Sequence, residues 1–286
     1  WTIGLFGASE RISTKSSTFV KSICSSLSSS TTTSSSSNNK CKYVKSLSQK
    51  KSRQKYGEYT IEGIKSVSDA LNSEREITAL YVSDSFFENE KFKYPKDISL
   101  YKVQDDVFMK MCDTKAPQGI LAVVKIEDET DFTPNTEKSY IYCDCINDPG
   151  NLGTIIRTAD AMGAAAVLLG TGSTDAFSPK ALRAAMGSTY HLRIFQCELS
   201  ETLPKLRESG FSLVCGHLAG EERLPMLNRD CVIVIGNEAN GVSDGIARLC
   251  SLCRLPMLGR AESLNASAAA SILIFETAKK INGIEF

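Results

Sequence analysis

Residues 146–170, INDPGNLGTIIRTADAMGAAAVLLG, indicate the architecture of the larger part of this chain. It reads as a loop, a helix that begins near Asn151 and a buried strand that ends at Gly170, and the apolar run YIYCDCI (140–146) precedes and overlaps it. A dinucleotide-binding fold would carry the pattern G-x-G-x-x-G here, with an acidic residue about 20 residues later. Gly150-Asn-Leu-Gly153 does not match this pattern. An NAD-dependent oxidoreductase is therefore disfavoured.

Two polar residues of this helix point to a different ligand. The side chain of Asn151 can cap the helix at its start. Arg157 follows within the first turns, where a positive charge is unfavourable beside the helix dipole unless it serves an anion. The alternative is a surface ion pair between Arg157 and Asp160.

Apolar runs alternate with helix-like segments from residue 140 onward. The later runs are AAAVLLG (164–170), LRIFQC (192–197), FSLVCGHL (211–218), CVIVIG (231–236) and LCRL (252–255). Continuous apolar strands of this kind are typical of a parallel sheet covered by helices on both faces. Such a sheet carries its chemistry on the loops that leave the strand ends. An Ala-rich helix is predicted over residues 263–280.

Two further stretches place polar residues after predicted strands. In CVIVIGNEANGVSDG (231–245), Gly236 and Gly241 allow the backbone to turn sharply and to approach a ligand closely. Glu238 lies between them and is either functional or an ordinary loop carboxylate. In LPMLGRAESLNASAAASILIFE (255–276), Ser263 and Asn265 stand at the start of the last helix, where a serine alone is most often an N-cap.

A smaller α/β unit is predicted over residues 56–126, and the charged, polar segment 127–139 is predicted to be a linker. In YTIEGIKSVSDALNS (59–73) the spacing of Ile61, Ile64, Val67 and Leu71 indicates a helix. The remaining elements are predicted as strands EITALYVS (76–83), ISLYKV (98–103) and QGILAVVKI (118–126), and helices SDSFFENEKF (83–92) and DDVFMKMC (105–112).

Residues 1–55 are predicted to be a disordered tail. The tract SSLSSSTTTSSSS (25–37) has one apolar residue in thirteen, too few to offset the entropy of ordering it. Residues 1–56 hold ten Lys and Arg against Glu10 alone, so the rest of the chain, with 23 basic and 32 acidic residues, carries −9. A Ser-rich, basic, acid-poor segment is typical of a transit peptide, for a plastid or a mitochondrion. The alternatives are a basic tail that helps to hold RNA, or a linker, in a cytoplasmic protein.

Composition limits the remaining functional classes. No apolar run approaches the roughly 20 residues of a membrane span, so no membrane partner is predicted. The ten cysteines are scattered and are expected to be reduced. The CxxC at Cys250 and Cys253 has no second pair, and His191 and His217 stand alone, so no metal site is predicted.

Together, the three stretches around Asn151, Glu238 and Asn265 resemble the motifs of the SpoU (TrmH) family of RNA ribose 2′-O-methyltransferases, part of the SPOUT superfamily. The resemblance covers residues 139–280. The preceding unit, through EGIKSVSDAL (62–71) and APQGILAVV (116–124), is similar to the small ribosomal-protein-like RNA-binding domain of members that act on ribosomal RNA. The motif NEAN (237–240) departs from the family pattern, in which smaller residues are commoner at Ala239 and Asn240.

The resemblance implies an α/β fold in which the C-terminal domain is a deep trefoil knot, an exception to the rule that chains avoid knots. It implies that S-adenosylmethionine binds in the knot through backbone groups around Gly236, Leu255, Met257 and Leu264. It also implies a homodimer in which the partner completes each site. The positions that match the family's functional residues are Asn151, Arg157, Glu238, Ser263 and Asn265.

The expected activity is therefore 2′-O-methylation of RNA. Ribosomal RNA is favoured over transfer RNA because of the small domain, and a non-catalytic RNA-binding protein with the same fold is the alternative from another class. Arg157 is expected to hold a phosphate or the attacking hydroxyl, since a charged guanidinium has no acceptor and is a poor general base. Asn151, Ser263 and Asn265 are expected to orient Arg157, the ribose and the cofactor loops. Glu238 is expected to fix those loops or to position the substrate.

Overall fold

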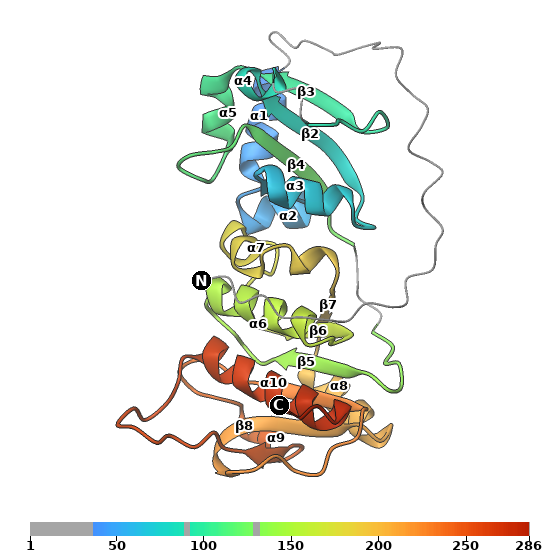
Figure 1. Cartoon of the computed structure of the whole chain (residues 1–286), viewed down its shortest axis with the longest axis vertical. Coiled ribbons are helices and arrows are strands. Elements are labelled where there is room, and N and C mark those ends of the chain that lie inside the picture. The colour runs from blue at the N-terminus through green and yellow to red at the C-terminus, as the bar shows by residue number, and fades with distance from the viewer. Residues whose placement is uncertain (1–36, 89–91, 128–131, 286) are drawn as a thin grey trace. The chain divides into compact units, whose positions relative to one another are not determined.

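A computed structural model describes residues 37–88, 92–127 and 132–285 of this chain. The predicted targeting segment lies mostly outside the described residues, as does part of the predicted linker. Two sheets organise the described part, one of four strands and one of six (Figure 1). Within it, no helix is long and apolar enough to cross a bilayer.

The first sheet belongs to the smaller unit and has the strand order β1-β4-β2-β3. Its strands are β1 (Glu58–Glu62), β2 (Ile77–Ser83), β3 (Ser99–Val103) and β4 (Ile120–Lys125). Strand β4 pairs antiparallel with β1 and β2, whereas β2 and β3 are parallel. The helices of this unit are α3 (Ile64–Leu71), α4 (Asp84–Phe87) and α5 (Asp105–Met111).

The prediction of one helix through residues 59–73 is wrong in its first part. Residues Glu58–Glu62 are strand β1, and the helix α3 begins only at Ile64. Gly63 separates the two elements with φ +96°, a backbone conformation that L side chains rarely adopt. Tyr59 and Ile61 are buried in β1, and Ile61 also lies three residues before Ile64, so the spacing of the apolar residues alone does not separate the strand from the helix.

The structure also corrects the boundary of the tail. Residues 37–55, predicted to be disordered, largely form the helices α1 (Ser37–Ser46) and α2 (Lys50–Tyr56). Cys41, Val44 and Leu47 are buried among residues of β2, β4 and α5. Cys41 and Val44 in α1, with Leu47 directly after it, are apolar residues three apart that anchor the helix, although serine and lysine dominate its composition.

The second sheet has the order β10-β8-β9-β5-β6-β7, and every pair in it is parallel. All six predicted apolar runs contribute strands, which confirms the predicted parallel sheet. The strands are β5 (Ser139–Cys143), β6 (Ala166–Gly170), β7 (Arg193–Cys197), β8 (Ser212–Glu221), β9 (Cys231–Ile235) and β10 (Ser251–Cys253).

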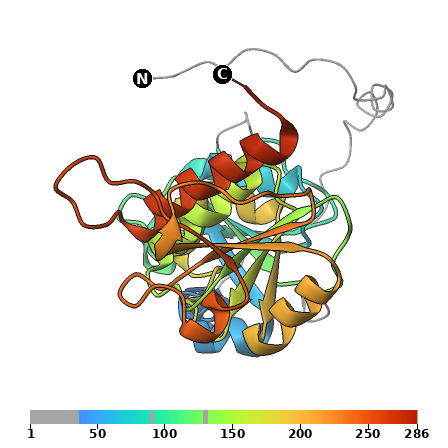
Figure 2. The same cartoon turned by 90° about the horizontal axis from the view of Figure 1, so that it is seen from below.

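Helices cover both faces of this sheet. On one face pack α6 (Pro149–Ala161) and α10 (Ala266–Asn282), and on the other α8 (Leu199–Glu208) and α9 (Asp244–Ala247). Figure 2 shows α10, in red, on one side of the sheet and the orange α8 on the other. The short helix α7 (Pro179–Ala185) packs against α6, and a 3₁₀ turn (Ser188–Tyr190) follows it. The carboxyl ends of β5 and β9 lead directly into the first and second motifs.

Candidate active site

Glu238 joins the loop after β9 to the start of α6. Its carboxylate accepts hydrogen bonds from the backbone N–H groups of Asn147 at 3.1 Å and Asp148 at 3.2 Å, and from the side-chain amide of Asn151 at 3.0 Å. Partial burial opposes ionisation of Glu238, but the hydrogen bonds from Asn151 and the backbone outweigh it, and its pKa lies below the ordinary value. The carboxylate is thus held ionised as a structural acceptor.

Asn151 links this carboxylate to the third motif. Its side-chain oxygen accepts a hydrogen bond of 3.1 Å from the side-chain amide of Asn265. The oxygen of Asn265 in turn accepts from the backbone N–H of Ser267 at 3.0 Å and Ala268 at 3.4 Å, and so caps α10. The structure therefore brings Glu238, Asn151 and Asn265 into one hydrogen-bonded chain.

The helix caps differ from those expected. Helix α6 begins at Pro149, and its N-cap is Asp148, whose carboxylate accepts from the backbone N–H of Asn151 at 2.9 Å. The side chain of Asn151 is therefore not a cap and is available to Glu238 and Asn265. Ser263 is not the cap of α10 either, since it is exposed and precedes the cap Asn265. The pair Asp148-Pro149 is a start signal that sequence reasoning could have used.

The loop of the second motif is fixed by a residue that the sequence reasoning missed. The side-chain amide of Asn237 donates to the backbone oxygen of Cys145 at 2.7 Å, and its oxygen accepts from the N–H groups of Ala239 and Asn240. A Cβ on Gly236 would lie 2.3 Å from the backbone of Gly241, so only glycine fits there. Ala239 and Asn240 are exposed, so the departure from the family pattern causes no clash in this loop.

Arg157 is exposed on α6 and is not part of the hydrogen-bonded chain. Among the described residues it has no hydrogen-bond or ion-pair partner. The alternative ion pair between Arg157 and Asp160 is not formed in the described part of the chain, and the carboxylate of Asp160 lies 3.7 Å from the imidazole of His191. The guanidinium is thus free to bind an external anion.

The segment between β10 and α10 has the character of a ligand-binding loop. Residues 255–264 make no backbone hydrogen bonds to other described residues, and Leu255 and Met257 are half-buried beside exposed polar positions. Free main-chain donors with apolar side chains among them fit a ligand such as S-adenosylmethionine, whose adenine can bond to backbone groups. Leu264 is 38% exposed, and Gly236 is half-buried in the second loop.

A cleft of about 640 Å³ lies next to part of this segment. It is lined by residues 222–224, 253–256 and the C-terminal end of α10, and of the four predicted cofactor residues it includes Leu255 alone. Glu238, Asn151 and Asn265 are outside it. In the described ranges no three His, Cys, Asp or Glu residues are grouped to hold a metal ion, and the cysteines found there are free thiols.

Two family models match this chain. Residues 138–275 match the SpoU rRNA Methylase family, and residues 38–122 match the MRM3-like substrate binding domain, which includes α1 and α2. A Bacillus subtilis protein named 23S rRNA (guanosine(2553)-2′-O)-methyltransferase RlmP is 34% identical, over 82% of this chain and 94% of its own length. The mouse protein named rRNA methyltransferase 3, mitochondrial, is 29% identical, over 80% of this chain and 69% of its own.

Solved structures give the same result. The crystal structure of an AdoMet-bound rRNA methyltransferase from Sinorhizobium meliloti is 31% identical and covers 87% of this chain and 97% of its own, with a TM-score of 0.76. Since the Bacillus relative matches across nearly its whole length, and the three motifs meet as described, this chain belongs to the SpoU rRNA methylase family.

Proposed function

We propose that this chain transfers a methyl group from S-adenosylmethionine to a ribose 2′-hydroxyl of ribosomal RNA. The hydrogen bonds that connect Glu238, Asn151 and Asn265 carry the proposal, because they join the loop after β9 to the start of α6 and the start of α10. Arg157, on the same helix as Asn151, has no partner among the described residues. The names of the Bacillus and mouse relatives support ribosomal RNA as the substrate.

S-adenosylmethionine, when bound, supplies a methyl group already activated on a sulfonium. The protein's task is then to position the hydroxyl and to stabilise the approach. Asn151 and Asn265 hold the start of α6 and the start of α10 together. Glu238 holds the second loop against the start of α6. Backbone groups near Gly236, Leu255, Met257 and Leu264 would bind the cofactor, and Ser263 is an exposed residue of the segment 255–264.

Arg157 holds the RNA. Its planar fork of N–H donors matches the geometry of a phosphate oxygen pair, and it fixes the nucleotide whose ribose is methylated. A charged guanidinium cannot accept the proton of the 2′-hydroxyl. That proton leaves to a phosphate oxygen of the RNA or to water.

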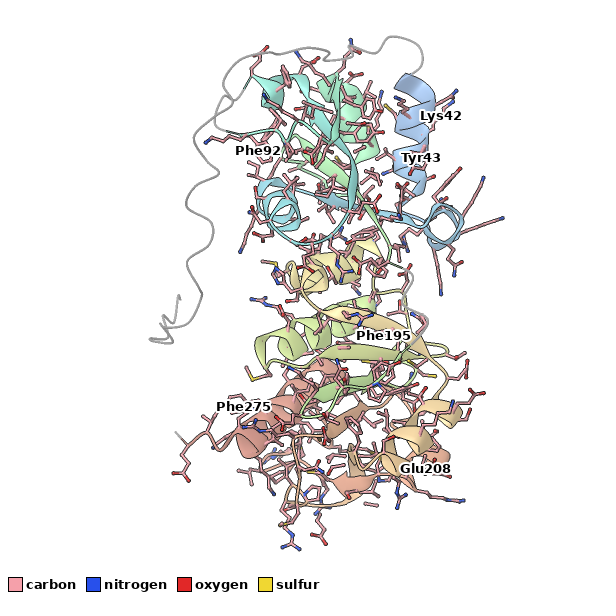
Figure 3. All side chains as sticks on the ribbon, turned by 90° about the vertical axis from the view of Figure 1, so that its right-hand side faces the viewer. Lys42, Tyr43, Phe92, Phe195, Glu208 and Phe275 are labelled. Atoms are coloured by element: carbon pink, nitrogen blue, oxygen red, sulfur yellow. The ribbon has the colours of Figure 1, made fainter. Side chains whose placement is uncertain are left out.

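The knot and the dimer are parts of the same proposal. The amine of Lys280 on α10 donates to the backbone oxygens of Leu224 and Pro225 at 2.9 and 2.8 Å, which supports a C-terminal segment packed inside the loop between β8 and β9. Ile272 and Phe275 of α10 are 42% and 36% exposed (Phe275 is labelled in Figure 3). Exposed apolar side chains on one helix support a face that a second copy covers.

The proposal extends to location. The chain acts in an organelle, and the name of the mouse relative as mitochondrial supports this. The Ser-rich, acid-poor composition of residues 1–36 supports it as well.

Methylation with tritiated S-adenosylmethionine tests the activity. Transcripts of ribosomal RNA should be labelled at a 2′-O-methyl position, and transfer RNA transcripts should not. Arg157→Ala should abolish labelling, while calorimetry shows cofactor binding unchanged. Equal labelling of transfer RNA would overturn the ribosomal assignment, and loss of cofactor binding in the variant would place Arg157 in the cofactor site.

A further inference from the structure

The two N-terminal helices form a strongly basic surface. Residues 37–57 contain seven Lys and Arg and no Asp or Glu. The charges are not spread along a tail, because buried Cys41, Val44 and Leu47 fix α1, and buried Arg53 fixes α2. The remaining side chains of these helices therefore project from a folded surface.

Four of the lysines have no acidic partner. Lys42, Lys50, Lys51 and Lys55 are exposed, and within the described part of the chain none forms an ion pair. Figure 3 shows Lys42 on α1 pointing away from the sheet. Lys45 differs from these four, because its amine donates to the backbone oxygen of Cys112 at 2.8 Å. The segment 37–57 has no carboxylate to neutralise these four ammonium groups. They therefore create a local positive potential, although the rest of the chain carries a net negative charge.

Two tyrosines stand among these lysines. Tyr56 is 44% exposed, and its ring meets that of Tyr43 edge-to-face, with the ring centroids 4.9 Å apart. The amine of Lys55 lies 4.9 Å from the centroid of the Tyr56 ring. An exposed ring held by a neighbour and surrounded by ammonium groups has the chemistry of a stacking platform for a nucleobase.

This surface is bonded to the loops of the site. The guanidinium of Arg53 donates to the carboxylate of Asp175 at 2.7 and 2.9 Å and to the backbone oxygen of Leu47 at 2.7 Å. Thr174, next to Asp175, donates its backbone N–H to the oxygen of Ile146 at 2.8 Å. Ile146 lies two residues before Asp148, the cap of α6. Two hydrogen-bonded contacts, Arg53 to Asp175 and Thr174 to Ile146, therefore link helix α2 to the loop that leads into α6, the helix that carries Asn151.

We propose that Lys42, Lys50, Lys51 and Lys55, with Tyr43 and Tyr56, bind a single-stranded segment of the substrate RNA. This inference, which rests on the proposed function, assigns the α1–α2 surface to the RNA that the site methylates. The lysines contact successive phosphates, and the Tyr56 ring stacks on a base. An anionic membrane fits less well, because the apolar side of α1 is buried and the helices have no exposed apolar face to insert.

The test compares two variants of equal charge change. K42Q/K50Q/K51Q/K55Q removes the surface, and K96Q/K110Q/K138Q/K205Q removes four exposed lysines elsewhere. Fluorescence anisotropy with a labelled ribosomal RNA fragment measures Kd at several salt concentrations. Each phosphate contact to a single strand contributes about 0.7 to the slope of log K against log salt. We expect the first variant to lower that slope by about 2 to 3 and to weaken binding about 10- to 100-fold, and the second to change neither.

Further measurements keep the outcome clear. Thermal unfolding and calorimetric cofactor binding should be unchanged in both variants. Tyr56→Ala should weaken RNA binding about 5-fold or more, and Tyr56→Phe should restore it. The proposal is overturned if the protein is an active methyltransferase but both four-lysine variants have the same RNA affinity and the same salt slope. It is also overturned if K42Q/K50Q/K51Q/K55Q loses binding to phosphatidylserine vesicles and keeps its binding to RNA. If neither ribosomal nor transfer RNA is methylated, the proposed function fails separately, because these binding measurements do not depend on turnover.

Discussion

The side-chain amide of Asn151 donates to the carboxylate of Glu238 across 3.0 Å, although 87 residues separate them in the chain. This bond fixes the second motif against the first, and Asn265 extends it to the third. Because Asn151 lies in α6, Glu238 in the loop after β9 and Asn265 at the start of α10, these bonds keep three separate segments in one arrangement before any ligand arrives. Preorganisation of this kind lowers the cost of ordering a binding site.

Replacing Asn151 by Asp should damage this arrangement more than replacing it by Ala. In Asn151→Asp the new carboxylate faces that of Glu238, and like charges at hydrogen-bond distance repel. Asn151→Ala only removes a hydrogen bond to a charged group, which is worth at most about 1.5 to 3 kcal/mol. We expect cofactor affinity to fall more than 10-fold in Asn151→Asp, as measured by calorimetry. Asn228→Asp, the same change on an exposed loop, is the control and should leave affinity unchanged. Equal affinities for Asn151→Asp and the parent protein would contradict a role in holding the loops.

The contribution of Glu238 to stability should depend on pH in one direction. Its pKa is lower in the folded protein than its ordinary value of 4.5, although partial burial acts against this. The ionised form therefore stabilises the fold above the ordinary pKa, and this contribution disappears as the pH falls through that value and the lower folded one. The difference in unfolding free energy between the parent protein and Glu238→Gln should be constant from pH 6 to 8 and should shrink below about pH 4.5. If this difference in unfolding free energy grew as the pH falls, the ionised carboxylate of Glu238 would instead destabilise the fold.

The buried ion pair between Arg53 and Asp175 should stabilise the fold strongly only as a pair. Their side chains are 3% and 16% exposed, so removing one partner leaves a charge with little water around it. We expect Arg53→Met to cost about 3 kcal/mol in unfolding free energy, in the range for a broken buried pair. Arg53→Met combined with Asp175→Asn should cost less than the sum of the two single changes. Urea unfolding in a double-mutant cycle measures this, and strict additivity would mean that the two groups do not interact.

Gly153 should tolerate no side chain. A Cβ there would lie 2.3 Å from the backbone oxygen of Ala181 and 2.6 Å from the Cβ of Ala184, both on α7. Gly153→Ala should destabilise the protein by about 1 to 3 kcal/mol, the usual cost of overpacking, even though alanine favours a helix. Gly245→Ala, in α9 with open space around it, should be close to neutral in the same thermal unfolding assay. Equal melting temperatures for the two variants would mean that α7 moves away at no cost.

The catalytic sheet was predictable because its strands are continuous apolar runs. Cys231–Ile235 is buried at every position. A short, continuous apolar run of this kind is typical of a buried strand, because helices are usually longer. Glu238, Asn151 and Asn265 were predictable because each follows a strand or opens a helix in a recognisable motif. Which groups they bond was not predictable, since it depends on Asp148 taking the capping role and leaving the Asn151 amide free.

The N-terminal helices were missed for a physical reason as well. The residues that fix α1 and α2 are Cys41, Val44, Leu47 and Arg53, and three of them are buried by strands or helices more than thirty residues away in sequence. The partner of Arg53 is Asp175, 122 residues distant. The composition of a segment indicates how polar its residues are on average. It does not detect a few anchoring residues whose partners lie far away in the sequence.

The bond from Arg53 to Asp175 affects how sequence variants in the N-terminal segment are interpreted. A substitution at residue 41, 44, 47 or 53 falls in a stretch whose composition resembles a cleavable leader, where most changes are harmless. In this protein such a substitution alters a folded domain, so a geneticist who discounts it as lying in a presequence would discard a damaging allele.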